Sequence, residues 1–374
     1  MFLANRPTRH ELAQAEIARV CAQATRLLVE APETITSSRS PRSPGGPNDY
    51  FSEGDYWWPD PANPGGPYIR RDGFSNPDNF NAHRDAMRRL SIIVAAHAAA
   101  FVGTADARFA RAAEAHLRAW FADPATAMTP HLRYGQAITG ITTGRGIGIV
   151  DTLHLIEVAL AAHHLEQRGA LPASLVASLK KWFAAYLQWL RFDQLGIDER
   201  DHGNNHSTCW LAQVITFALL TNDREALEES RERYGLLLEQ QIAADGSFPL
   251  EKSRTKPFNY SIFNVELFSV CAQLLDVAGL PCRHEVAANG AGLLTACEWL
   301  FPAYQSRENW TLPPDVEYFE HMPFRSLWLL TSGLAFDQPS WIDVFQTLDP
   351  EPTIPELVRN MPFRQPMLWF CLTR

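Results

Sequence analysis

Apolar residues recur at spacings of three and four along most of the chain, which is the pattern of helices that bury one face. The clearest run is Trp210, Leu211, Val214, Ile215, Ala218 and Leu219. Short turns with helix-stop residues separate these runs, for instance Gly169, Asp223, Gly246 and Gly279. Convincing strands, in which apolar and polar residues alternate, are scarce. The pattern predicts helices over about 9–30, 81–102, 106–121, 136–165, 172–192, 205–220, 224–241, 258–278, 285–300, 322–334 and 353–360.

Consecutive helical hairpins without a sheet leave two architectures. One is an open α-solenoid, and the other is an α/α toroid, in which the hairpins form an incomplete barrel. The sequence shows no fixed repeat of roughly 20 to 50 residues, which open solenoids usually have. We therefore predict an all-α protein whose residues 1–374 form a single α/α toroid, with a cleft lined by the loops between helices.

Residues 32–77 differ from the rest of the chain because they hold nine of the 26 prolines, so they cannot form a long helix. A disordered linker is one interpretation, but the aromatic content of this segment argues against it. The aromatic residues are Tyr50, Phe51, Tyr56, Trp57, Trp58, Tyr68 and Phe74. We predict a loosely held loop over 37–48, and an ordered loop over 49–80 that packs on the helices and covers the cleft.

Composition narrows the class of protein. Of the 374 residues, 46% are apolar and 20% are charged, which is typical of a globular chain with a large core. The net charge of −9 argues against nucleic acid as a partner, although a local basic cluster could still bind an acidic ligand. The most apolar helical stretch, 146–165, carries Asp151, His154 and Glu157, so no membrane span and no membrane partner is expected.

Two further features bear on location and cofactors. The first thirty residues lack a secretory signal, which predicts a cytoplasmic protein by default, or a periplasmic or secreted one if the start has been trimmed. The six cysteines include no CxxC pair, so we expect buried thiols rather than a zinc site or a dense disulfide framework. The oligomeric state stays open.

The first candidate for chemistry is the segment from Asp201 to Trp210, which enters a strongly apolar helix. His202, Asn204, Asn205 and His206 gather there, at a helix N-terminus whose free N–H groups favour anions. The alternative is a helix cap formed by Asn204 or Asn205, with the histidines as ordinary polar loop residues. Both interpretations stay open.

The second candidate runs from Glu251 to Tyr260. Pro257 suits the first turn of a helix, and Tyr260 then lies on the apolar stripe of that helix, just after Arg254 and Lys256. Nearby cations should lower the pKa of the tyrosine, which would suit a general base. The alternative is a core tyrosine beside a solvated basic loop.

Three other segments add polar or aromatic groups. Tyr56, Trp57 and Trp58 lie in the proline-rich loop and would either stack on sugar rings or fill a core. The glycine-rich segment 142–148 has no preceding strand and no Gly-Lys-Ser/Thr, so it is not a nucleotide loop. We expect its glycines to permit close helix packing and to present Arg145. The acidic and aromatic segment 314–323 is expected at the mouth of the cleft.

Taken together, these segments resemble the alginate-lyase superfamily of polysaccharide lyases, from about Tyr56 to Arg325. The sharpest parts are Asn204-Asn205-His206-Ser207 and Arg254-Thr255-Lys256-Pro257 leading to Tyr260. The resemblance implies a helical toroid and a catalytic group of Asn205, His206, Arg254 and Tyr260. The Tyr-Trp-Trp-Pro-Asp-Pro segment at 56–61 looks like a branch that includes glucuronan lyases.

The implied activity is cleavage of a β-1,4-linked polyuronate, glucuronan or mannuronate-rich alginate, by β-elimination. Asn205 and Arg254 would neutralise the substrate carboxylate, and His206 would donate to it or serve as a second base. Tyr260 would remove H5 and protonate the leaving oxygen. The reaction needs no metal or organic cofactor, and the partner is an acidic polysaccharide. Further substrate-binding candidates are Tyr56, Trp57, Trp58, Arg70, Arg71, His83, Arg84, Arg145, Asn204, Lys256, Glu317 and His321.

Two rival functions remain. A glycoside hydrolase on the same toroid would need two carboxylates that flank the scissile bond. The available carboxylates are Asp55, Asp201, Asp315 and Glu317. A non-catalytic, sugar-binding helical module would instead leave the Asn-His and Arg-Tyr motifs far apart in space.

Overall fold

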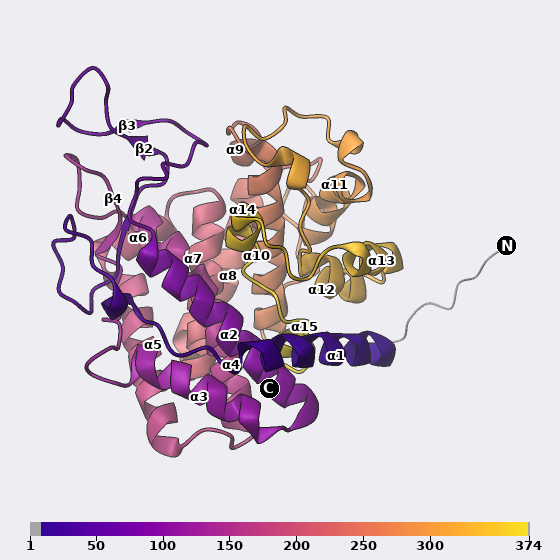
Figure 1. Ribbon diagram of the computed structural model, residues 1–374. Coiled ribbons are helices and arrows are strands. Elements are labelled where there is room, and N and C mark those ends of the chain that lie inside the picture. The colour runs from indigo at the N-terminus through magenta and orange to yellow at the C-terminus, as the bar shows by residue number, and fades with distance from the viewer. Residues whose placement is uncertain (1–8, 373–374) are drawn as a thin grey trace.

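The computed structural model describes residues 9–372, most of which are helical (Figure 1). The α-helices are α1 (Arg9–Leu27), α2 (Ala82–Thr104), α3 (Ala107–Phe121), α4 (Leu155–Gln167), α5 (Ala173–Phe192), α6 (Gln194–Arg200), α7 (Asn205–Thr221), α8 (Arg224–Gln241), α9 (Pro249–Lys252), α10 (Pro257–Val277), α11 (Leu293–Gln305), α12 (Trp328–Ala335), α13 (Pro339–Thr347), α14 (Pro355–Asn360) and α15 (Pro366–Phe370). The 3-10 helices are η1 (Ile35–Ser37), η2 (Gly146–His154), η3 (Arg307–Asn309) and η4 (Phe319–His321). The short strands are β1 (Phe51–Glu53), β2 (Trp57–Trp58), β3 (Ile69–Arg70) and β4 (Tyr134–Ala137).

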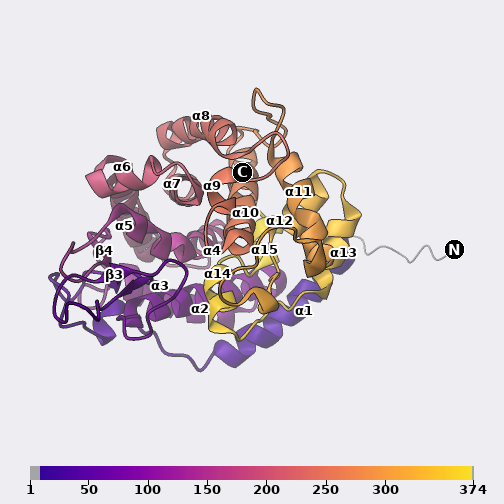
Figure 2. The same ribbon diagram turned by 90° about the horizontal axis from the view of Figure 1, so that it is seen from above.

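The helices form two layers around a ring, which Figure 2 shows from above. Helices α2, α4, α7, α10 and α12 pack against one another in that order and form the inner layer. The outer layer consists of α3, α5, α8, α11 and α13. Each of these helices packs on the inner helix that precedes it or on the one that follows it in the chain. Near the C-terminus, α15 packs on α1, α2 and α4. The fold is therefore the expected α/α toroid, an incomplete barrel of helical hairpins.

The sequence explains which helices lie inside the ring. Helices α7 and α10 are apolar around nearly their whole circumference, and almost all of their residues are buried. Helices α3 and α8 carry charged residues on one side and bury only the other. A helix that is apolar on all sides is stable only where other elements surround it. The sequence pattern therefore accounts for the places of α7 and α10 in the inner layer.

The proline-rich segment lies at one end of the ring as ordered loops (Figure 1). Strand β2 pairs with β3 in antiparallel fashion, and β1 pairs with β4 in parallel fashion. The prediction of a loosely held loop over 37–48 is wrong, because Ser40 is buried and the Asn48 side chain donates to the Ala127 carbonyl oxygen at 2.8 Å. Arg42 also forms an ion pair with the buried Glu53 at 2.6 Å.

The predicted helix over 136–165 is α-helical only from Leu155 onward, in about its last third, which belongs to α4. The part before Leu155 contains the end of β4, a loop and η2. The glycines of this segment allow loops to touch, since a Cβ on Gly144 would lie 1.9 Å from the Arg133 carbonyl oxygen. A Cβ on Gly148 would likewise lie 2.8 Å from the backbone of Gly135. Gly144 and Gly148 therefore pack loop on loop, whereas Gly146 packs on helix α6 as expected, with a Cβ there only 2.7 Å from the Leu195 carbonyl oxygen. Arg145 lies between them on an extended backbone.

Other boundaries also differ from the sequence pattern. The helices expected over 285–300 and 322–334 begin later, at Leu293 and Trp328, and the pattern misses α6 and α13.

Helices over Ala82–Thr104 and Gly146–Gln167 are long and apolar enough to cross a membrane, but both are mostly buried in the core. The six cysteines are free thiols, and four of them are buried. The first eight residues, which belong to the stretch on which the expectation about a secretory signal rests, lie outside the described residues.

Candidate active site

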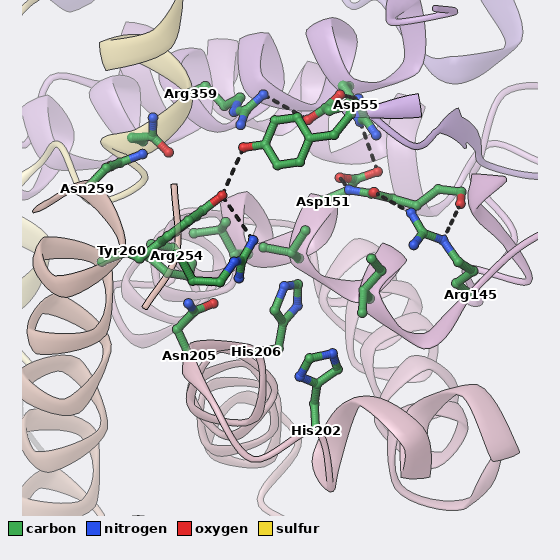
Figure 3. Close-up of a pocket in the computed structure, with 18 of the residues that line it drawn as sticks. Asp55, Arg145, Asp151, His202, Asn205, His206, Arg254, Asn259, Tyr260 and Arg359 are labelled. Carbon is green, nitrogen blue, oxygen red and sulfur yellow. Dashed lines mark hydrogen bonds and ion pairs between the residues drawn. The ribbon is translucent and has the colours of Figure 1, made fainter. Parts of the chain in front are cut away.

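One cleft of about 330 Å³ opens where the proline-rich loops meet the N-terminal ends of α7 and α10. Figure 3 shows that side chains from these distant segments point toward one another in it. The lining residues are Asp55, Tyr56, Trp57, Arg70, Arg84, Arg88, Gln136, Arg145, Ile147, Val150, Asp151, Leu153, His154, His202, Asn205, His206, Arg254, Asn259, Tyr260, Phe263, Arg359 and Asn360. Asn205, His206, Arg254 and Tyr260 thus reach a single cleft.

The start of α7 holds Asn205 and His206 in place. Asn204 caps the helix, because its side-chain oxygen accepts from the backbone N–H of His206 at 3.1 Å. The backbone N–H and the side-chain amide of Asn205 both donate to the Glu251 carboxylate, at 2.8 and 2.6 Å. His206 Nδ1 lies 2.7 Å from Oε1 of Glu199, which is fully buried. The edge of the His206 ring that carries Nε2 is left for the cleft.

The start of α10 positions Tyr260 in the same way. The carboxylate of Asp315 accepts the backbone N–H groups of Phe258 and Asn259, at 2.8 and 3.0 Å, and so fixes the first turn. The guanidinium of Arg254 lies over the Tyr260 ring at 4.4 Å, and its Nη2 donates to the phenol oxygen at 3.3 Å. The hydroxyl of Tyr56 lies 3.1 Å from that of Tyr260 and joins the proline-rich loop to the site.

The pKa of Tyr260 corrects the expectation from sequence. Burial raises this pKa well above its ordinary value, and the neighbouring Tyr56 hydroxyl adds to the rise. Arg254 acts in the opposite direction but does not outweigh burial. The predicted lowering by nearby cations is therefore wrong for the free protein. The residue is a neutral phenol at rest, and any phenolate is a minor species near neutral pH.

Cations dominate the lining although the chain as a whole is acidic. Six arginines line the cleft, against two carboxylates, Asp55 and Asp151. Both carboxylates are engaged by Arg84, and Asp55 also pairs with Arg359 at 2.8 Å. Burial opposes the ionisation of Asp55, yet Arg84 and Arg359 hold its pKa below the ordinary value. The cleft therefore attracts anionic ligands.

Arg145 stands out among these arginines because it forms no ion pair with any described carboxylate. It donates instead to the backbone and side-chain oxygens of Gln136, at 2.9 and 3.2 Å. Burial and the nearby Arg70 lower the pKa of Arg145 to about 10. A partly buried guanidinium without an anionic partner is unfavourable, so an anionic ligand group would stabilise it.

Several other residues that the sequence suggested also line the cleft: Tyr56, Trp57, Arg70, Arg84 and Arg145. Two suggested residues of the same loop do not. The indole N–H of Trp58 donates to the Phe74 carbonyl oxygen at 3.0 Å, and the Arg71 guanidinium lies over the Trp58 ring at 5.0 Å. Trp58 and Arg71 therefore stabilise the outside of the loop.

Five more suggested residues also lie outside the lining. Both ring nitrogens of His83 are used by the backbone, at Phe51 N–H and the Ser38 carbonyl oxygen. Lys256 is buried and pairs with Glu317 at 3.2 Å and with Glu356 at 3.1 Å, so Lys256 and Glu317 neutralise each other. Asn204 acts as the helix cap described above. His321 lies exposed beside Glu320.

Sequence reasoning missed some lining residues. Arg359 and Asn360 come from α14 near the C-terminus, about a hundred residues from Tyr260, and no local motif marks them. Asn259 precedes Tyr260 and could have been noticed from that position.

Among the described residues, no group of three or more His, Cys, Asp or Glu could hold a metal ion.

Comparison with known proteins gives the family and the fold of this chain. The sequence model of a family described as alginate lyase matches residues 34–310. A crystal structure of an alginate lyase from Bacteroides ovatus is similar over 95% of this chain and 93% of its own, with 25% identity and a TM-score of 0.81. Alginate lyase A1-III from Sphingomonas species A1 shares the fold at 18% identity, with 88% and 92% of the chains covered and a TM-score of 0.54. No curated protein matches.

Proposed function

The chain belongs to the alginate lyase family and is a polysaccharide lyase that acts on polyuronates, and from this premise we propose that it cleaves β-1,4-linked glucuronan or mannuronate-rich alginate by β-elimination. The reaction removes H5 of a uronate and expels the oxygen linked to C4. Its product carries a 4,5-unsaturated uronate at the new end.

The chemistry sets three tasks for the cleft. The C5 proton is too weakly acidic while the adjacent carboxylate keeps its charge, so donors must neutralise that carboxylate and stabilise the intermediate. We assign this task to Arg254, Asn205 and His206. A base must then remove H5, and an acid must protonate the leaving oxygen. We assign both transfers to Tyr260, because H5 and O4 lie on the same face of β-D-glucuronate and β-D-mannuronate.

One observation carries this proposal. The Nε–H of Arg254 is buried and has no hydrogen-bond partner among the described residues, while the same guanidinium stacks on Tyr260. A buried donor without a partner costs about 1–3 kcal/mol, which a bound acceptor would recover. A uronate carboxylate at Arg254 would bring its own C5 next to the Tyr260 hydroxyl. The C5–H group that loses its proton and the base that removes it would then be adjacent.

The hydrolase alternative lacks suitable carboxylates. Asp151 lines the cleft, but its Oδ2 already accepts hydrogen bonds from Ser52 and Arg84, at 2.5 and 3.1 Å. Asp315 caps α10, Glu317 pairs with Lys256, and Asp201 pairs with Arg200 and Arg233 outside the cleft. Asp55 does line the cleft, but its lowered pKa is opposite to what a general acid requires. The non-catalytic alternative also loses its basis, because the two motifs reach the same cleft.

A substrate panel tests the proposal. Purified protein should be given glucuronan, polymannuronate, polyguluronate and pectate, and the ultraviolet absorbance of the unsaturated product should be followed. We expect activity on glucuronan or polymannuronate and much less on polyguluronate, whose H5 and O4 lie on opposite faces. Release of reducing ends without ultraviolet absorbance would indicate a hydrolase and would refute the proposal.

The tandem tryptophans give an internally controlled prediction. Trp57 lines the cleft, with Arg145 at 5.9 Å from its ring, whereas Trp58 faces away. Replacing Trp57 with alanine should raise KM about 3- to 10-fold with little change in kcat, because a stacking face for a sugar is lost. Trp58→Ala is the matched control and should affect thermal stability more than KM. Equal KM values for wild type and both variants would show that the loop is purely structural.

A further inference from the structure

Asn259 is a buried polar residue of the cleft that no step of the proposed reaction uses. Its relative exposure is 3%, it lines the cleft, and it directly precedes Tyr260. Its side-chain oxygen Oδ1 has no hydrogen-bond partner among the described residues. In Figure 3, Asn259 lies on the far side of Tyr260 from Asn205 and His206. It therefore lies apart from Asn205 and His206, which are proposed to hold the carboxylate.

The position of Asn259 is fixed rather than adaptable. Its backbone N–H donates to Asp315 at 3.0 Å, and Pro257 restricts the first turn of α10 just before it. The backbone that carries this amide is thus held in place before any ligand arrives. A buried acceptor held without a donor is unfavourable, and a donor from the ligand would remove this cost.

The chemistry of a polyuronate limits what that donor can be. The carboxylate carries no proton, and O4 and O1 are linked to neighbouring sugars inside the polymer. Only the hydroxyls at C2 and C3 can donate. Glucuronate and mannuronate differ from each other in the orientation of the C2 hydroxyl alone. An acceptor that contacts this hydroxyl would therefore distinguish the two polymers.

We infer that Asn259 is a substrate-binding residue that accepts a hydrogen bond from the C2 or C3 hydroxyl of the bound uronate, and that it distinguishes the two polymers if its partner is the C2 hydroxyl. The inference rests on the proposed polyuronate substrate. The polar side chains in the first turn of α10 then have two tasks: Tyr260 acts on the bond to be cleaved, and Asn259 contacts a hydroxyl of the sugar ring. This division explains why an unpaired amide lies next to a residue assigned to the chemistry.

The test compares Asn259→Ala with Asn264→Ala. Asn264 is a matched control, because it lies on the same helix, is buried, and also has an unpartnered Oδ1. It lies outside the cleft, and its Nδ2 donates to Gln241 at 2.8 Å. Both variants should be assayed on glucuronan and polymannuronate, with thermal melts to confirm folding. We expect Asn259→Ala to lower kcat/KM about 3- to 10-fold on at least one polymer, and Asn264→Ala to leave kcat/KM unchanged on both.

Each outcome decides the inference. A larger loss on one polymer supports a contact with the C2 hydroxyl, and equal losses support the C3 hydroxyl. A folded Asn259→Ala protein with wild-type kcat/KM on both polymers would overturn the inference and leave the lyase function intact.

A second readout does not depend on catalysis. The affinity for a glucuronate or mannuronate oligosaccharide can be measured by calorimetry in the Tyr260→Phe variant, which does not depend on cleavage. Adding Asn259→Ala to that variant should weaken this affinity. Unchanged affinity would overturn the inference. A wild-type protein that neither cleaves nor binds any polyuronate would overturn the proposed function and this inference together.

Discussion

Replacing Tyr260 with phenylalanine should lower the rate of polyuronate cleavage by about 10²- to 10⁴-fold while leaving most substrate binding intact. The phenol is the group that we assign to both proton transfers, and phenylalanine keeps the ring that stacks under Arg254. The lost hydroxyl contacts only Tyr56 and Arg254 among the described residues, at 3.1 and 3.3 Å. The free energy of unfolding should therefore fall by no more than about 1 kcal/mol.

The measurement is the initial rate of ultraviolet absorbance increase on the preferred polymer, with a thermal melt of each variant. Tyr304→Phe is a suitable control, because its hydroxyl is buried, bonds Ser326 and lies outside the cleft. That variant should lose stability and keep its rate. A folded Tyr260→Phe protein that retained more than a small fraction of the wild-type rate would transfer the base role to His206.

The raised pKa of Tyr260 also predicts the pH dependence of the wild type. If the phenolate is the working base, the active fraction increases about tenfold per pH unit at any pH below that pKa. The logarithm of kcat/KM should therefore keep rising from mildly acidic into alkaline solution. A plateau reached near neutrality would indicate a base with a much lower pKa and would argue against the tyrosine.

Local sequence signals predicted the toroid, and together with the family resemblance they singled out four candidate residues that line the cleft: Asn205, His206, Arg254 and Tyr260. Helix starts are marked by short-range chemistry, the Asn204 cap for α7 and Pro257 for α10, so the side chains of each first turn could be located. The apolar pattern of α7 and α10 placed both helices in the core. Their N-terminal ends are then brought to the same rim because adjacent inner helices of the ring pack directly against each other.

What the sequence did not reveal depends on contacts between distant segments. Lys256 looked like a solvated or substrate-binding cation, but Glu356, a hundred residues later, pairs with it in the interior. Arg359 enters the cleft from the same late helix and pairs with Asp55 from the first loop. The glycine-rich segment before α4 kept an apolar pattern although its backbone does not form an α-helix. The pKa of Tyr260 also follows from burial, which three-dimensional packing decides.

Replacing Arg254 with alanine should lower kcat/KM by about 10²- to 10³-fold, the usual cost of removing a positioned donor that stabilises developing negative charge. Arg254 connects the two halves of the mechanism, since its guanidinium would bind the substrate carboxylate while it stacks on the tyrosine. Arg254→Lys should be intermediate, because lysine keeps the charge but lacks the planar fork. The loss should appear mainly in kcat, since the interaction strengthens as charge builds up on the carboxylate.

The same substitution should also shift the pH profile. Arg254 is the neighbour that lowers the pKa of Tyr260 against the effect of burial, so without it the pKa should rise further. The rising limb of kcat/KM should then move to higher pH in Arg254→Ala. Arg71→Ala is the control, because Arg71 also lies over an aromatic ring but outside the cleft, and it should leave the profile in place. If Arg254→Ala raised KM while kcat and the pH profile stayed unchanged, Arg254 would hold the substrate without activating it, and the carboxylate would have to be neutralised by Asn205 and His206 alone.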